Sequence, residues 1–121
     1  MTLDLARMVS REVETLQAAG VPAASSAADL PGPGVLVQAP DLDFGFGGQI
    51  TALHRGLVLA GGLDRTAALA QIGPILADAA RVLSVTVAEA VDVPGVDAAG
   101  PAPGYRIRWS RKYMPRKENR R

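Results

Sequence analysis

Between residues 63 and 83 the apolar side chains recur every three or four positions, which is the spacing of one face of an α-helix. Asp64 or Thr66 is a suitable N-cap, and Arg81 lies where the helix dipole favours a cation. Pro74 removes a hydrogen bond, but the pattern keeps its phase across it, which predicts one kinked helix. The apolar stripe is wide enough to lie on a sheet and contains Ala68, Leu69, Ile72, Ile75, Leu76, Ala79, Val82 and Leu83.

The remaining pattern predicts a second helix and four strands. Residues 2–19 form an amphipathic helix with Thr2 as its N-cap and Gly20 at its end. Alternating or β-branched runs predict strands over residues 34–39, 50–60, 85–93 and 105–113. The order α-β-β-α-β-β indicates an α+β fold, a four-stranded mixed sheet with two helices packed on it.

Some segments carry more specific expectations. Gly56 interrupts its strand and predicts a bulge or bend. The strand at 85–93 is expected to be half-buried, with Glu89 as a charged residue on its apolar face. Residues 23–33 and 40–49 are predicted to be connecting loops.

The last predicted strand has the clearest alternation in the chain. Tyr105, Ile107 and Trp109 share one face, which we expect to belong to the core. The opposite face is polar and cationic, and it contains Arg106, Arg108, Ser110 and Lys112.

Length and composition restrict the class of protein. The 121 residues predict one domain, 1–113, followed by a basic tail, 114–121. No apolar run approaches the roughly 20 residues that span a bilayer, and the first residues do not resemble a signal peptide, so we expect no membrane association. The chain has no cysteine, which excludes disulfides, thiolate catalysis and cysteine-ligated zinc.

The net charge of +1 conceals an asymmetry along the chain. Residues 1–105 contain five basic and eleven acidic side chains, whereas residues 106–121 contain eight basic and one acidic. An acidic body with a basic end suggests self-association or docking on an acidic surface. The basic end has three interpretations: a charge-protected edge strand, a docking arm onto an acidic neighbour, which we favour, or a nucleic-acid contact.

Three partial motifs around residue 45 do not predict chemistry. The DFG triplet at 43–45 lacks the other parts of a protein kinase. Asp41 and Asp43 begin like a calcium loop, but Phe46 replaces its turn glycine and Ala52 its bidentate glutamate. The glycine-rich run at 45–48 does not complete a dinucleotide motif and precedes a strand. A hairpin loop that exposes Phe44 and Phe46 as contact residues is the better interpretation.

The chain also lacks a recognisable catalytic constellation. His54 is the only histidine, no G-x-S-x-G elbow accompanies it, and the carboxylates are scattered. A histidine at a sheet face or a subunit contact is the preferred interpretation. We therefore expect no enzymatic activity, no metal site and no cofactor.

Taken as a whole, the pattern resembles the tail terminator proteins of long-tailed bacteriophages, which join the head to the tail. The resemblance covers nearly the full chain. It lies in the N-terminal helix that ends at Ala19-Gly20-Val21, the strand PGVLV, the strand LVLAGG leading to the helix AALAQIGPILADAARVL, and the final PAPGYRIRWSRKY. Pro74 and the Arg/Lys-rich tail depart from the family pattern.

The resemblance implies a structural virion protein at the tail–neck junction, assembled in the host cytoplasm. It would form a homohexameric ring that caps the tail tube, binds the tail-tube protein and a head-completion or stopper protein, and lets DNA pass without sequence-specific binding. The residues expected at its interfaces are Phe44, Phe46, Arg111, Lys112, Arg116, Lys117, Arg120 and Arg121. The alternatives are another neck protein (stopper, adaptor or tail-completion protein) or a small nucleic-acid-binding module.

Overall fold

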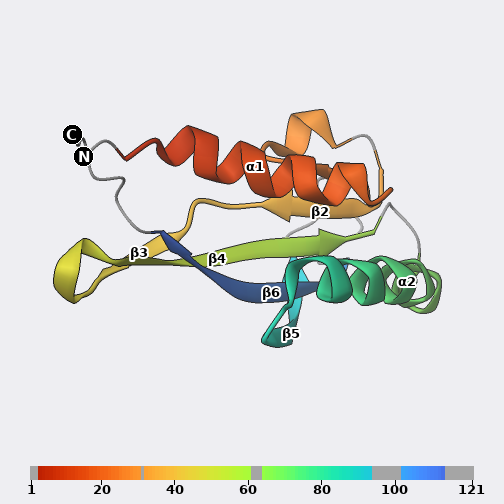
Figure 1. Ribbon diagram of the computed structural model, residues 1–121. Helices are drawn as coiled ribbons and strands as arrows, with labels where there is room; N and C mark the ends of the chain where they lie inside the picture. Colours follow the sequence, from red (N-terminus) through yellow and green to blue (C-terminus); the bar gives the residue numbers. More distant parts are fainter. Residues whose placement is uncertain (1–2, 31, 61–63, 94–101, 114–121) are drawn as a thin grey trace.

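The computed structural model describes residues 3–30, 32–60, 64–93 and 102–113 (Figure 1). Within these ranges there are two α-helices and six strands, with short 3-10 turns at Ala27–Asp29 and Phe46–Gly48. In chain order the elements are α1 (Leu5–Ala18), β1 (Ala23–Ala24), β2 (Gly34–Val37), β3 (Asp41–Phe44), β4 (Ile50–Leu59), α2 (Arg65–Leu83), β5 (Val87–Val93) and β6 (Ala102–Tyr113).

All six strands belong to one mixed sheet. Its order is β1-β2-β4-β6-β5, and β3 pairs with the first half of β4. Only β1 and β2 are parallel neighbours, since every other pair is antiparallel. The chain leaves β4, crosses through α2 to β5, and returns as β6 between them. The two strands that flank α2 in the chain, β4 and β5, are therefore separated in the sheet by β6.

The α+β class and the two helices packed on a mixed sheet are confirmed, but the expected sheet of four strands is wrong. The two additional strands, β1 and β3, lie in stretches that were predicted to be loops. Backbone hydrogen bonds define β1, and the N–H of Val35 also donates to the carbonyl of Pro22 at 2.9 Å just before it. In β3 the short alternation of acidic and apolar residues pairs with β4 from Asp41 opposite Leu53 to Phe44 opposite Ile50.

Helix α1 begins later than expected. Asp4, not Thr2, is its N-cap, because the Asp4 carboxylate accepts a hydrogen bond from the Arg7 N–H at 3.0 Å. Thr2 lies outside the described residues. The end of the helix is as predicted, with Gly20 in the left-handed region at φ +83°.

Helix α2 is a single helix that continues through Pro74, as predicted. Asp64 is its N-cap and accepts from the Ala67 N–H at 2.9 Å. The predicted stripe is only partly buried: Leu69, expected to face the sheet, is 43% exposed. The residues that α2 buries fully are Ala68, Ile72, Ala79 and Leu83.

One hydrophobic core lies between the helices and one face of the sheet. The sheet contributes Val35 and Val37 of β2, Val58 of β4, and Ile107 and Trp109 of β6. The helices meet them with residues that include Leu16, Ile72, Ala79 and Leu83. Because both helices contact the same cluster, they cover the same face, and no helix of the described ranges covers the other face, which we call the open face.

The expected bulge at Gly56 is absent, since the β4–β6 register is unbroken from Ile50 to Leu59. The glycine instead makes room. A Cβ at Gly56 would lie 3.1 Å from the Leu36 carbonyl oxygen and 3.6 Å from the Trp109 ring. The shorter distance shows that the glycine accommodates the close approach of the β2 backbone, whereas the distance to Trp109 is an ordinary van der Waals contact.

The expectation that residues 85–93 form a half-buried strand is also wrong. Strand β5 lies at the edge of the sheet. Its first four residues, Val87 to Ala90, are all exposed. Glu89 lies opposite Arg106 on the open face of the sheet, and the two side chains form an ion pair at 3.3 Å. Alternation alone could not distinguish this exposed edge from a covered strand.

Candidate functional site

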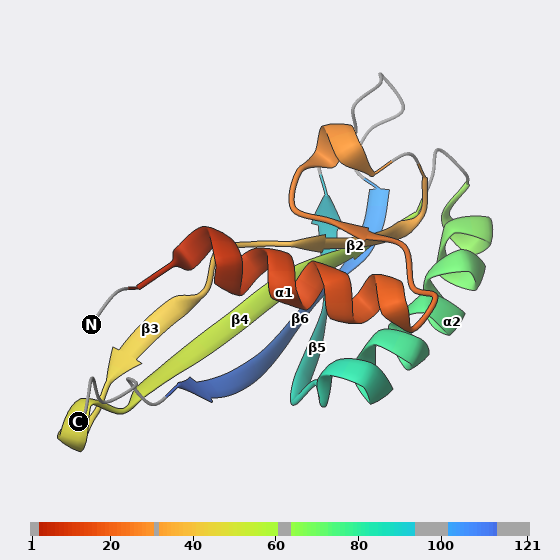
Figure 2. The ribbon, with the colours of Figure 1, turned by 45° about the horizontal axis from the view of Figure 1, so that its top comes forward.

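The β3–β4 hairpin, residues 41–59, carries the predicted contact residues Phe44 and Phe46. Its tip lies at one end of the molecule, at the far end from α2 (Figure 1, Figure 2). Phe44 is 63% exposed, and Phe46, in the turn, is fully exposed. Asp43 precedes them, is exposed, and forms no ion pair within the described part of the chain. The tip therefore presents two aromatic rings beside an exposed carboxylate.

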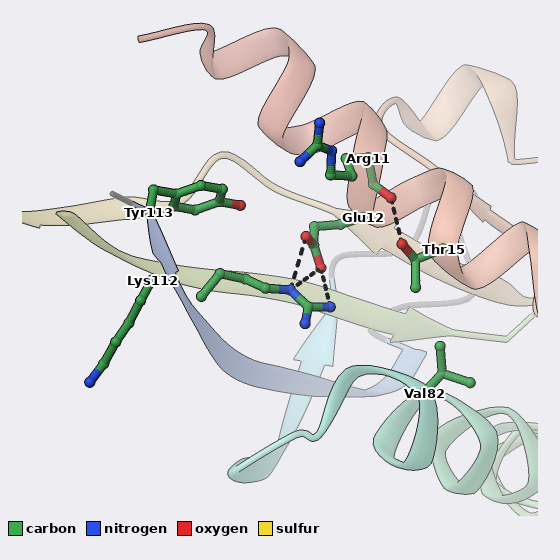
Figure 3. Close-up of a pocket in the computed structure, with 7 residues that line it drawn as sticks. Arg11, Glu12, Thr15, Val82, Lys112 and Tyr113 are labelled. Carbon is green, nitrogen blue, oxygen red and sulfur yellow. Dashed lines mark hydrogen bonds and ion pairs between the residues drawn. The ribbon is translucent and has the colours of Figure 1, made fainter. Parts of the chain in front are cut away.

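Two more of the predicted contact residues, Arg111 and Lys112, lie on opposite sides of β6. Arg111 shares the helix-facing side of β6 with Trp109, and its guanidinium pairs with Glu12. Lys112 is exposed and its side chain points away from Tyr113 (Figure 3). The remaining predicted contacts, Arg116, Lys117, Arg120 and Arg121, lie outside the described residues.

Glu12 of α1 is the centre of a buried polar group that the sequence did not reveal. It is only 1% exposed, and each oxygen of its carboxylate accepts at least one hydrogen bond. Oε1 accepts from Trp109 Nε1 at 2.8 Å and from Arg111 Nη2 at 3.0 Å, and Arg111 Nε lies 3.2 Å from both carboxylate oxygens. Such charge-assisted bonds are short and directional. They attach α1 to β6 at one defined position.

His54 of β4 completes this group. It is fully buried, and its ring stacks on Trp109 with centroids 5.5 Å apart and an angle of 13°. Its Nε2 lies 3.3 Å from Tyr113 Oη and 3.9 Å from Glu12 Oε2, whereas Nδ1 has no partner among the described residues. We infer that Nε2 carries the proton, because it faces the Glu12 carboxylate, which can only accept a hydrogen bond.

Burial is the main reason why the pKa of His54 is lowered from its ordinary value of 6.5. The Glu12 carboxylate opposes this shift, and the Arg111 guanidinium adds to it. His54 is therefore neutral near pH 7. We call Glu12, His54, Trp109, Arg111 and Tyr113 the Glu12 cluster.

The Glu12 cluster contains an imidazole beside a carboxylate, but both are sealed between α1 and the sheet. A general base must reach the proton that it removes; His54 is fully buried, and the Glu12 carboxylate is held by Trp109 and Arg111. The cluster is suited to fixing α1 on the sheet. The expectation that His54 lies at a sheet face is met, on the side that the helices cover.

A pocket of ≈ 480 Å³ opens beside the cluster, between α1, the end of α2 and the end of β6 (Figure 3). Burial is the main cause that raises the pKa of Tyr113; Glu12 adds to the shift, while Arg111 and Arg11 oppose it. Arg11 is exposed and forms no ion pair within the described ranges. The pocket is lined by Arg11, Glu12, Thr15, Val82, Arg111, Lys112 and Tyr113.

The open face of the sheet is the third feature with contact potential. Two ion pairs cross its strands, Arg55 with Asp41 at 3.5 Å and Arg106 with Glu89 at 3.3 Å. Arg108 is exposed on the same face, and the described residues offer it no ion pair. Exposed Leu53 and Val87 add apolar area.

In the described ranges, no three or more His, Cys, Asp or Glu residues lie close enough together to bind a metal ion. Across those same ranges, no helix has both the length and the apolar character that crossing a membrane requires.

We compared the chain with protein families, curated proteins and solved structures. The chain matches no protein-family model, and no curated protein or solved structure is significantly similar to it.

Proposed function

We propose that this protein is a tail terminator of a long-tailed bacteriophage. Six copies would form a ring on the end of the tail tube and join it to a head-completion or stopper protein. The proposal begins from the family resemblance of the sequence. It is supported by features of the fold that suit a subunit with several protein neighbours.

The observation that carries the proposal is the exposed aromatic tip of the β3–β4 hairpin. Phe44 and Phe46 contribute little to the core of their own subunit, since one is 63% exposed and the other fully exposed. Aromatic residues are enriched at the centres of protein interfaces, where they bury a large area at small entropic cost. Two of them at a projecting tip indicate a partner protein.

The attachment of α1 gives the hairpin a rigid base. Ile50 and Ala52, in the first half of β4, are buried, and the Glu12 cluster fixes the helix above this part of the sheet. A ring subunit needs such a base, because the position of each contact surface determines whether the ring closes.

Tail assembly tests the proposal. Tails lacking the protein are mixed with heads and with wild-type protein or the double variant Phe44→Ser/Phe46→Ser. We expect wild-type protein to appear as a ring at the tail tip in electron micrographs and to restore joining, and the variant to lose joining while its melting temperature changes little. Leu69→Ser, at an exposed leucine of α2, is the matched control and should join normally. Wild-type protein that never binds the tail tip would refute the proposal.

A nucleic-acid-binding module is the second candidate, favoured by Arg108 on the open face and by Lys112 farther along the same strand. Phosphate contacts make affinity fall steeply with salt. If this candidate is correct, the monomer binds DNA in a salt-dependent manner and Arg108→Glu weakens binding. A tail terminator should show neither effect.

A further inference from the structure

The hairpin tip and the α1–β6 pocket of this chain have complementary chemistry. The tip carries Phe46 and the carboxylate of Asp43, to which the described part of the chain offers no cation. The pocket carries the guanidinium of Arg11, which forms no ion pair with any described residue. Because Phe46 is fully exposed, it does not occupy the pocket of its own subunit.

The pocket is large enough for a phenylalanine side chain. An apolar cavity of about 150 Å³ already holds a benzene ring, and this pocket measures ≈ 480 Å³. Val82 and the Tyr113 ring supply apolar contact, and their positions on opposite sides of the pocket are seen in Figure 3. An aromatic ring between them would pack against Tyr113 and lie near the Arg11 cation, both of which are favourable contacts.

The charges explain why the occupant would be another copy of this chain. Glu12 and Arg111 neutralise each other inside the subunit, so the other two cations that line the pocket, Arg11 and Lys112, give it a net positive charge. The exposed acidic residue nearest to the aromatic tip is Asp43, since Asp41 already pairs with Arg55. Opposite charges at the two surfaces favour this pairing over contact between two tips, which would bring like charges together.

We propose that the hairpin tip of one subunit binds in the α1–β6 pocket of a second copy, with Phe46 inside the pocket and Asp43 facing Arg11. Two different surfaces meet in such a contact, so each subunit offers one of each and the chain of contacts can close into a ring. The inference rests on the proposed ring-forming function and specifies which surfaces of the subunit form the ring.

Cysteine cross-linking tests the contact directly, because the chain has no cysteine of its own. Full-length Phe46→Cys and Thr15→Cys are mixed and oxidised. We expect a disulfide-linked dimer in the mixture and none with either variant alone. Phe46→Cys mixed with Leu69→Cys is the matched control, since Leu69 is exposed on α2 and does not line the pocket.

Association measured by analytical ultracentrifugation tests the charge pair. Arg11→Glu should weaken self-association at least about tenfold, as expected for a central interface residue. Adding Asp43→Arg to the same chain should restore it. Arg7→Glu, one turn earlier on the exposed side of α1, is the charge-matched control and should associate like wild type.

The outcomes separate this inference from the proposed function. A cross-link between positions 46 and 15, with recovery by the charge swap, supports the contact whether or not the protein joins tails. Absence of the cross-link, or dimers of Phe46→Cys alone, overturns it. If the cross-link is absent and Phe46→Ser still abolishes head–tail joining, the tip binds the tail tube, which overturns the inference and leaves the proposed function intact.

Discussion

The two helices lie on the same face of the sheet, but different chemistry attaches them. Helix α2 buries only apolar side chains, Ala68, Ile72, Ala79 and Leu83. Helix α1 buries Met8 and Leu16 with a carboxylate between them, Glu12. The apolar attachment of α2 depends on area and has no preferred direction. The attachment of α1 depends on hydrogen bonds at a single register.

The difference shows that the interactions that determine where a helix lies need not be those that contribute most to the stability of the fold. A buried ion pair often adds little net stability, because removing two charges from water costs about as much as their attraction returns. It does make displaced arrangements costly, since a shift of α1 would leave the Glu12 carboxylate without Trp109 and Arg111. We infer that the cluster mainly defines where α1 lies.

The largest expected effect comes from Trp109, which serves both attachments. Its ring belongs to the common core, and its N–H donates to Glu12 at 2.8 Å. Trp109→Ala should lower the free energy of unfolding by about 3–5 kcal/mol, the cost of a large cavity in a core. Chemical denaturation measures it. A loss below about 1 kcal/mol would mean that Trp109 is not part of a packed core.

Removing one member of the ion pair should come next. Arg111→Met leaves the buried charge of Glu12 without its cation and should cost about 2–3 kcal/mol, below the range for fully buried pairs because the Arg111 side chain is 36% exposed. The double variant with Glu12→Gln keeps the acceptor for Trp109 and removes the charge. It should recover at least half of the loss. A double variant less stable than Arg111→Met would show that the charge itself stabilises the fold.

Acid should weaken the α1 attachment and leave that of α2 unchanged. Folding lowers the pKa of His54, so the unfolded chain binds the proton more tightly than the folded chain. The free energy of unfolding therefore falls as pH decreases below about 6.5, by at most about 1.4 kcal/mol per pH unit for one proton. Denaturation at pH 7.5 and about 5.5 measures the change. His54→Gln should reduce the slope, whereas Ile72→Val, which shortens an apolar side chain of α2 and changes no titratable group, should keep it.

The smallest effect is expected at an exposed ion pair. Arg65 and Asp92 lie 3.4 Å apart, but both side chains are more than 60% exposed. Arg65→Ala should change the free energy of unfolding by less than about 0.5–1 kcal/mol. An equal loss for Arg65→Ala and Arg111→Met would remove the contrast between the two kinds of ion pair.

The elements that the sequence predicted well are those with a local pattern. The alternation in β6 and the periodicity of α2 each involve neighbours within a few residues, and both elements were found where expected. Strand β1 is only two residues long and has no side-chain pattern to read. The exposed edge of β5 could not be recognised either, because burial depends on which element covers a strand.

The Glu12 cluster escaped prediction for a different reason. A glutamate is rarely buried without a partner, and its partners here are 97 and 99 residues away. A local signal was present, since Glu12 lies one turn after Met8 and one turn before Leu16 on the buried side of α1. A charged residue inside an apolar stripe is therefore a reason to search for a distant cation and N–H donor.

The position of β6 in the sheet has a consequence for how the chain folds during synthesis. This strand follows every other described element in the chain, yet it pairs with both β4 and β5 and carries Trp109 and Arg111. Until β6 leaves the ribosome, β4 and β5 have open edges and Glu12 has no partner. Native contacts between the two ends of the chain close a long loop, which slows folding. The domain should therefore fold late and cooperatively, and nascent chains without β6 should depend on chaperones.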